Sequence, residues 1–363
     1  KEMITDLEEN VVISFYGQKD FIDMCRGPHV DRTGKLKEFK ILSVAGAYWR
    51  GDEKREMLQR LYATAFFTKE DVDKYVTERE EAQRRDHRKL GKSLDLFSFQ
   101  EEGPGFPFWH PKGVILMKQV MRYVEEILVK HGYKEIMTPM VLNEELWHKS
   151  GHWDHYRNNM YFVDIDESKY AIKPMNCPGC CLVYKNDMRS FRDLPVKFAE
   201  WGKVHRHEKK GVLSGLQRVR AFTQDDAHVF CLPNQLEGEI MDIMDMIHEI
   251  YTRFNFTYRM ELSTRPEKSM GTEEMWANAE GSLKQALEKR NVNYKLNPGD
   301  GAFYGPKIDY HIKDCLGRDW QCATIQVDMS MPEKFDLTYI DSDNKPHRPV
   351  MVHRALLGST ERL

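Results

Sequence analysis

The fold class is decided by two runs, Lys307-Ile308-Asp309-Tyr310-His311-Ile312 and Trp320-Gln321-Cys322-Ala323-Thr324-Ile325-Gln326-Val327. Both are typical of β-strands, and so is the run over residues 254–262. Helical spacing of apolar residues occupies residues 237–253 and 273–290, so strand and helix rarely alternate. This pattern favours an antiparallel sheet with segregated helices, and the sequence therefore predicts an α+β core.

Outward from this core, the pattern divides the chain into residues 1–67, 68–85 and 86–363. The first part mixes short apolar runs with turns, and the last forms the main body. The very polar middle part predicts a solvated helix that joins two domains, although an exposed helix of a single domain fits as well. The other expected elements are strands over 11–16, 40–49 and 135–138 and helices over 53–66 and 112–131.

The composition excludes several classes of protein. Of 363 residues, 41% are hydrophobic and 31% charged, which is typical of a folded chain rather than a disordered one. No stretch approaches the length of a membrane span, and the first residues lack the apolar core of a signal peptide. Seven cysteines are too few for a disulfide scaffold, which predicts reduced thiols and a cytoplasmic location and leaves metal binding open.

The net charge of -3 excludes a wholly cationic protein, but one segment is strongly basic. Residues 185–220 hold ten basic and four acidic residues. Arginine suits phosphate because its planar fork donates two parallel hydrogen bonds. The segment therefore indicates a phosphate or nucleic-acid contact, with a solvated basic loop as the alternative.

The spacing of cysteines and histidines leaves several chemistries open. Cys177 and Cys180 form a C-x-x-C pair without a second such pair, so a zinc ligand, a redox thiol and a structural turn all fit. Asp225, Asp226 and His228 fit a metal site, a site for a hydroxyl or ammonium group, or a loop cap. The P-loop, Rossmann and α/β-hydrolase classes have no support, because none of their glycine motifs occurs.

Taken together, these segments resemble a known family, the bacterial-type threonyl-tRNA synthetases of class II. The three class II motifs appear in order as the helix and strand that end at Pro139, the runs 204–208 and 218–222, and residues 358–362. The strings that resemble the threonyl enzymes in particular are Lys173-Pro174-Met175-Asn176-Cys177-Pro178-Gly179, residues 223–228 and residues 350–355. The resemblance covers essentially the whole chain. It implies a class II antiparallel sheet flanked by helices, preceded by the end of an α+β editing domain.

The resemblance also implies an activity. L-Threonine is activated with ATP to threonyl-adenylate and pyrophosphate, and threonine is then transferred to tRNA(Thr). A zinc ion held by Cys177, His228 and His353 is expected to select threonine, because valine lacks the hydroxyl that binds the metal. The other implied threonine contacts are Asp226 for the hydroxyl and Gln224 and Tyr304 for the amino group.

The same family pattern implies an ATP site with Mg²⁺ on the phosphates. Arg206 is expected to stabilise the charge that develops on the α-phosphate. The other implied contacts are Glu208 at the adenine edge, Phe222 stacked on the ring, Arg218 and Arg362 at the γ-phosphate, Gln321 near the ribose and Lys307 near the carboxylate. Catalysis then rests on positioning and electrostatics by Arg206, Arg362 and Lys307. His152 matches a position implicated in proton transfer to the tRNA.

The resemblance further implies a homodimer formed through the first motif, and the chain departs from the family in three places. Cys25 and His29 match half of the editing site, and the H-x-x-x-H half is absent, so we expect no editing by this chain. Cys180 stands where the family has histidine. The sequence ends inside the third motif, at Leu363, and its start also suggests a fragment of a longer protein.

Three other interpretations stay open. A synthetase-like binding or regulatory module would keep the fold without catalysis, although the ATP set of Arg206, Phe222 and Arg362 argues against it. Prolyl or seryl synthetases share the three motifs, but they give no reason for the implied zinc ligands to occur together with Asp226. A zinc-dependent hydrolase would need a base near the metal-bound water.

Overall fold

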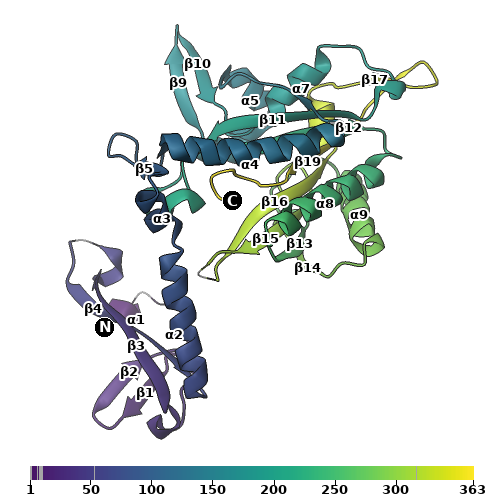
Figure 1. The fold of residues 1–363 in the computed structure, drawn as a ribbon. Coiled ribbons are helices and arrows are strands. Elements are labelled where there is room, and N and C mark those ends of the chain that lie inside the picture. Colours follow the sequence, from purple (N-terminus) through teal and green to yellow (C-terminus); the bar gives the residue numbers. More distant parts are fainter. Residues whose placement is uncertain (1, 6, 8–10, 53, 316) are drawn as a thin grey trace. The chain divides into compact units, whose positions relative to one another are not determined.

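The computed structural model describes residues 2–5, 7, 11–52, 54–315 and 317–363. This part of the chain forms two compact units, Lys1–Glu81 and Ala82–Leu363. Figure 1 shows the helices and strands of both units, coloured along the sequence.

The first unit is built on antiparallel hairpins. Its elements are α1 (Glu2–Thr5), β1 (Phe15–Gln18), β2 (Phe21–Met24), β3 (Glu38–Tyr48), β4 (Met57–Phe66) and the greater part of α2 (Lys69–Arg84). Strand β3 corresponds to the strand predicted over 40–49, and β1 overlaps only the end of the one predicted over 11–16. Thr68 caps α2 by accepting a hydrogen bond from the Asp71 N–H, so the polar segment is helical as predicted.

The helix predicted over residues 53–66 is wrong, because residues 57–66 form strand β4. The apolar residues whose spacing suggested a helix, Met57, Leu58 and Leu61, are all exposed, so a helix would have no apolar face to bury. The backbone of β4 pairs instead with β3 along its length, which satisfies the N–H and C=O groups that face β3. An apolar run this short fits the helical and the strand period alike.

The second unit is organised around an eight-stranded sheet. In spatial order its strands are β14 (Tyr294–Asn297), β13 (Tyr258–Ser263), β15 (Lys307–Lys313), β16 (Asp319–Asp328), β19 (Val350–Ala355), β12 (Ala221–Cys231), β11 (Val196–His205) and β7 (Lys134–Glu135). Only the two outermost pairs are parallel. The runs that decided the fold class form the antiparallel pair β15 and β16, and the predicted α+β fold is confirmed.

Three amphipathic helices cover one face of this sheet: α4 (Pro111–Lys130), α8 (Leu236–Arg253) and α9 (Glu273–Lys289), of which α8 and α9 lie side by side in Figure 1. Val229 and Val352 point to this face and pack in one core with Ile243 of α8. Their neighbours Phe230 and Met351 point to the opposite face and pack in a second cluster. The alternation of side chains along β12 and β19 therefore gives the sheet two faces, one covered by the three helices and one that carries the second cluster and can also carry a functional site.

Smaller elements surround the second face. They are α3 (His87–Ser93), β5 (Phe97–Phe99), β6 (Pro107–Trp109), β8 (Val141–Asn143), α5 (Glu144–Ser150), α6 (His152–Tyr156), β9 (Tyr161–Ile165), β10 (Ser168–Ile172), α7 (Cys177–Lys185), α10 (Ser330–Lys334), β17 (Tyr339–Ile340) and β18 (Pro346–His347). Helix α7 packs on the second cluster through its buried cysteines.

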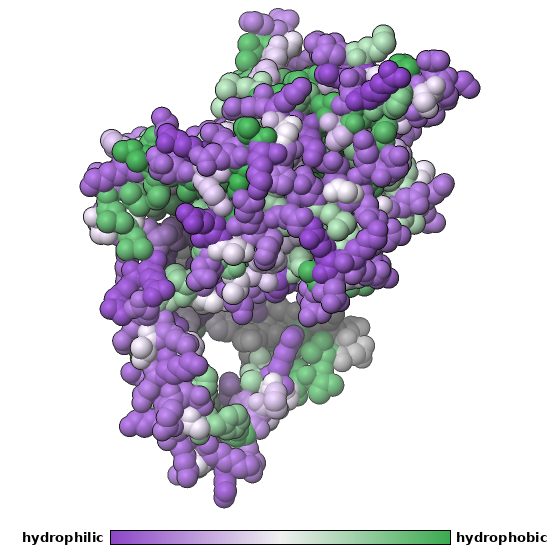
Figure 2. Space-filling model, turned by 45° about the vertical axis from the view of Figure 1, so that its right-hand side comes forward, coloured by the Kyte–Doolittle hydropathy of each residue, from purple (hydrophilic) through white to green (hydrophobic). Residues whose placement is uncertain are grey.

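The surface drawn in Figure 2 is mostly hydrophilic, and hydrophobic residues appear there in separate patches. Among the described residues, no helix combines the length and the apolar character that crossing a membrane requires.

Candidate active site

Two neighbouring strands present the predicted metal ligands on one face of the large sheet. His228 on β12 pairs directly with His353 on β19, and their ring centroids are 4.9 Å apart. Both side chains point away from α8, because the adjacent Val229 and Val352 occupy the core on that side. Cys177 is the first residue of α7 and reaches the same place from above the sheet.

The ligand atoms of Cys177, His228 and His353 all lie within 4.8 Å of one another. Nε2 of His228 is buried and has no hydrogen-bond partner among the described residues, while Nε2 of His353 lies 2.9 Å from Oδ2 of Asp328. Burial lowers the pKa of His228 well below its ordinary value, so the imidazole is neutral and can bind a cation. A carboxylate behind one imidazole is a common support for a metal ligand. A thiol with two imidazoles fits zinc and leaves a coordination position open.

A cavity of about 570 Å³ opens beside these three residues. The expected site residues on its wall are Cys177, Arg206, Glu208, Arg218, Phe222, Gln224, Asp226, Tyr304, Gln321, His353 and Arg362. They come from strands β12, β16 and β19, from the loops around them and from the first residue of α7. Sequence segments that are far apart thus meet in one cavity.

The end of the cavity beside the metal ligands carries hydrogen-bonding groups. Oδ1 of Asp226 lies 3.8 Å from Nε2 of His228, and burial raises the pKa of this carboxyl group. The Tyr304 hydroxyl donates a hydrogen bond of 2.7 Å to Oε1 of Gln326. The Tyr304 ring lies 4.9 Å from the His353 ring, between centroids, and forms part of the same wall.

The other end of the cavity is rich in guanidinium groups. Arg206 lies over the Phe222 ring, with 5.0 Å between the guanidinium carbon and the ring centroid. Nε of Arg218 lies 3.0 Å from Oε2 of Glu208 in an ion pair. Arg362, in the segment that follows β19, also lines this end of the cavity. Three guanidinium groups beside an aromatic ring suit a ligand that combines phosphates with a planar base.

Three of the expected residues lie off the cavity wall. His228 is a buried member of the metal-ligand set and lies on the same strand and face as Asp226. The Lys307 ammonium lies 2.5 Å from Oδ2 of Asp309, in a buried ion pair. His152 is fully buried with Nε2 4.0 Å from Sγ of Cys177, and burial lowers its pKa to about 3.

The remaining expected residues are Cys180, which stands where the family has histidine, and the pair Cys25 and His29, which matches half of the editing site. Cys180 is fully buried in α7, and burial together with the nearby Asp226 carboxylate raises the pKa of its thiol well above the ordinary value. In the first unit, the ligand atoms of Asp23, Cys25 and His29 lie within 4.8 Å of one another at a largely exposed position.

Sequence reasoning named Asp225 as a candidate site residue but missed its supporting role, and it missed Asp328 altogether. Asp225 is buried, and its carboxylate accepts hydrogen bonds from the N–H groups of Leu356, Leu357 and Gly358 at 2.6, 3.0 and 3.0 Å. Asp328 is likewise fully buried behind His353. Only the register between β12, β16 and β19 brings these groups together, and no local spacing in the sequence signals it.

Two family models match the chain. Residues 161–363 match the tRNA synthetase class II core domain (G, H, P, S and T), and residues 13–62 match the threonyl and alanyl tRNA synthetase second additional domain. All strands of the large sheet except β7, and the arginines of the cavity, therefore lie in a class II aminoacyl-tRNA synthetase core.

Individual relatives narrow this class. The chain is 61% identical to the threonine–tRNA ligase of Acetivibrio thermocellus and 60% identical to that of Clostridium kluyveri. Each match covers 99% of this chain and 57% of the relative, so the chain spans little more than half the length of these curated relatives.

Solved structures agree with this assignment. The crystal structure of the RNA binding domain of threonyl-tRNA synthetase from Cryptosporidium parvum Iowa II is 45% identical with a TM-score of 0.75, over 76% of this chain and 70% of that one. A Giardia lamblia prolyl-tRNA synthetase in complex with prolyl-adenylate shares the fold, with a TM-score of 0.58 and 20% identity over 76% of this chain and 49% of that one. The chain belongs to the threonyl-tRNA synthetase family.

Proposed function

We propose that this chain carries the aminoacylation site of a threonine–tRNA ligase. In the proposed reaction, L-threonine attacks ATP to give threonyl-adenylate and pyrophosphate, and threonine then passes to tRNA(Thr). The observation that carries the proposal is that Cys177, His228 and His353 converge within 4.8 Å beside the same cavity that Arg206 lines. The setting we propose for this activity is the cytoplasm.

Threonine recognition is assigned to the end of the cavity beside the metal ligands. Cys177, His228 and His353 would hold a zinc ion, which when bound would supply a Lewis-acidic centre for the amino group and the hydroxyl of threonine. Asp226 accepts the hydrogen bond of the hydroxyl. The remaining contacts, to the amino group, are assigned to Gln224 and Tyr304, which line the same wall. Sites built around a substrate hydroxyl reject analogues that lack it by about 10⁴-fold or more.

ATP is assigned to the arginine-rich end of the cavity, with Mg²⁺ on its phosphates. Arg206 stabilises the charge that develops on the α-phosphate, and Phe222 stacks on adenine. In the structure Arg218 forms an ion pair with Glu208. ATP binding would break this ion pair, so that Glu208 contacts the adenine edge and Arg218 contacts the γ-phosphate. The remaining assigned contacts are Arg362 at the γ-phosphate, Gln321 at the ribose and Lys307 near the threonine carboxylate and the α-phosphate.

Transfer to tRNA is assigned to His152. Its imidazole is neutral because burial lowers its pKa to about 3. An imidazole with so low a pKa is a weak base, so acceptance of the proton of the attacking ribose hydroxyl requires that tRNA binding raise this pKa towards the working pH. Its place beside Cys177 puts it next to the proposed threonine site.

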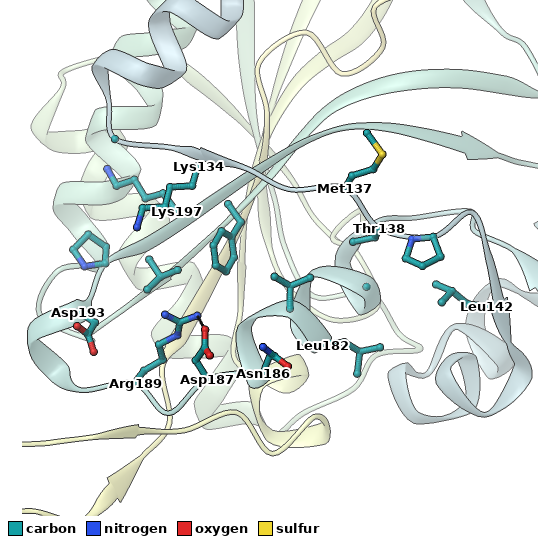
Figure 3. A pocket seen from close by; sticks show the side chains of 17 residues that line it. Lys134, Met137, Thr138, Leu142, Leu182, Asn186, Asp187, Arg189, Asp193 and Lys197 are labelled. Carbon is teal, nitrogen blue, oxygen red and sulfur yellow. Dashed lines mark hydrogen bonds and ion pairs between the residues drawn. The ribbon is translucent and has the colours of Figure 1, made fainter.

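The proposed active form is a homodimer that joins through the first motif. Strand β7 lies at one edge of the large sheet, and beside it opens a cavity of about 790 Å³. Figure 3 shows Met137 and Thr138 on one side of this cavity and Leu182 and Asn186 of the α7 region on the other. Met137 is 88% exposed in the single chain, and a second copy would cover it.

The proposed domain division is residues 1–67 for the end of the editing domain, 68–85 for the linker helix and 86–363 for the catalytic domain. The match of residues 13–62 to the second additional domain and the helix Lys69–Arg84 support it. Cys25 and His29 are proposed as part of the hydrolytic site that this additional domain carries.

The test is threonine-dependent exchange of pyrophosphate into ATP, with serine and valine as competing substrates and with and without a zinc chelator. We expect activity with threonine, weaker activity with serine, only a trace with valine at about 10⁴-fold below threonine, and loss on chelation that added zinc restores. Absence of exchange from a chain that binds zinc would overturn the catalytic assignment in favour of a binding module. Exchange that persists after chelation would overturn the zinc assignment alone.

A further inference from the structure

Asn176 is buried beside the proposed threonine site, with 1% of its surface exposed. It directly precedes α7, a position where asparagine commonly caps a helix by accepting a hydrogen bond from the backbone. Here the side chain makes no such cap. Its amide is therefore used for something other than the helix.

The amide instead contacts Asp226. Nδ2 of Asn176 donates a hydrogen bond of 3.0 Å to Oδ2 of Asp226, and the other carboxylate oxygen, Oδ1, lies 3.8 Å from Nε2 of His228. The reverse orientation of the amide would set its oxygen against the carboxylate, so the bond defines the orientation of both groups. One oxygen of Asp226 is thus held, and the other faces the metal ligands.

A glycine provides the space for this amide. A Cβ atom at Gly202 would lie 2.2, 2.3 and 2.4 Å from Nδ2, Oδ1 and Cγ of Asn176. Gly202 lies on β11 directly opposite Gln224 of β12, so the amide rests on the sheet next to the cavity wall. Any side chain at position 202 would displace Asn176 from Asp226. Glycine inside a strand often marks such a close approach.

We propose that Asn176, seated over Gly202, is a positioning residue that holds Asp226 for the threonine hydroxyl and so sets the discrimination between threonine and valine. This inference rests on the proposed function. With Oδ2 held by Asn176, Oδ1 is the acceptor left for the hydroxyl. A hydrogen bond to a charged group corresponds to about 10- to 100-fold in an equilibrium constant. Valine offers no hydroxyl, so its weak reaction does not depend on the orientation of Asp226.

The test compares Asn176→Ala and Gly202→Ala with the wild type in pyrophosphate exchange with threonine and valine. Both variants are expected to lower kcat/KM for threonine by about 10- to 100-fold, mainly through KM, and to leave valine unchanged. Zinc content should stay at the wild-type level. The matched control is Gly238→Ala in α8, where an added Cβ has nothing within 4 Å, and it should leave the ratio of threonine to valine unchanged.

Asn176→Ala separates positioning from a purely structural role, because it keeps the Asp226 carboxylate: positioning predicts a selective rise in KM for threonine, whereas a structural role predicts loss of stability and zinc, with both substrates affected. The double variant Asn176→Asp with Asp226→Asn restores a hydrogen bond with donor and acceptor exchanged, so thermal stability should recover. An unchanged ratio of threonine to valine in both single variants would overturn the inference, and so would loss of zinc from both. Equilibrium dialysis of threonine and valine makes the same comparison without catalysis, so failure of the wild type in exchange would count against the proposed function alone.

Discussion

Asp225 and Asp226 are adjacent in the sequence, yet the alternation of strand β12 gives them different tasks. Asp226 lines the cavity, whereas Asp225 is buried and binds three backbone N–H groups in the loop that leads to Arg362. Burial raises the pKa of Asp225 to about 6, against 3.8 for the ordinary group. Desolvation of the carboxylate thus outweighs its hydrogen bonds and the nearby Arg354.

This shift makes stability depend on pH. Because the folded state holds the proton of Asp225 more tightly than the unfolded state, the stabilisation is complete below pH 3.8 and is lost as the pH rises through about 6. Between pH 5 and pH 7.5 the free energy of unfolding of the wild type should fall by about 1 kcal/mol relative to Asp225→Asn. Urea unfolding at both pH values measures the difference.

The control for this prediction is Asp164→Asn, at an exposed position on β9. It should follow the wild type at both pH values. Parallel pH dependence of the wild type and Asp225→Asn would show that Asp225 has an ordinary pKa.

Helix α4 is the longest helix of the second unit, and its first turn packs closely on the segment that precedes it. A Cβ at Gly113 would lie 2.0 Å from the backbone oxygen of Leu96 and 2.8 Å from the Trp109 ring. The N–H of His110 donates to that same oxygen at 2.9 Å, so the backbone there has little freedom to move. Glycine at this position is required by packing and not by helix formation.

Two glycine substitutions in helices should therefore have opposite effects. Gly113→Ala should lower the free energy of unfolding by about 1–3 kcal/mol, because the added methyl group overlaps fixed backbone atoms. Gly238→Ala in α8 should raise it by about 0.5–1 kcal/mol, because the new Cβ meets open space and alanine favours a helix. Chemical denaturation of both variants checks the pair, and a stabilising Gly113→Ala would refute the packing account.

At the scale of the whole second unit, three buried, hydrogen-bonded side chains, Thr138, Lys173 and Glu200, lie between the proposed dimer face and the proposed active site. Thr138 lines the cavity beside β7, and its N–H and Oγ1 both donate to Oε1 of Glu200 at 2.9 Å. Lys173 completes this group with Nζ 2.7 Å from the same oxygen. Glu200 lies directly opposite Asp226 in the sheet, so the proposed dimer face and the proposed threonine site are joined through this buried group.

The proposed dimer gives a prediction at this scale. Met137→Glu places a carboxylate where the second copy would bury a methionine, so the dimer should weaken by about 10-fold or more. Analytical ultracentrifugation at micromolar concentration measures the change. The control is Leu296→Glu on β14, a 55% exposed residue at the opposite edge of the sheet, which should leave the dimer intact. A wild type that sediments as a monomer would contradict the proposed interface.

Much of the second unit could be predicted from the sequence. The helices over 112–131, 237–253 and 273–290 and the strands that became β15 and β16 follow from long periodic patterns of apolar residues. The helix expected over 53–66 failed, because its apolar residues are exposed and strand pairing with β3 decides the conformation. The spacing of apolar residues predicts a helix or strand only where those residues are buried in a core.

The sequence by itself determined the α+β class, and its motif strings indicated the family. Only the tertiary structure decided how the site is supported: Asp225 anchors the Arg362 loop, Asp328 backs His353, and Asn176 occupies the space over Gly202. The physical reason is strand register. Periodicity acts over neighbouring residues, whereas these contacts join residues that are 25 positions apart, for Asp328 and His353, or 132 apart, for Asp225 and Leu357, or depend on the absence of a side chain at Gly202. They exist only once the strands have paired.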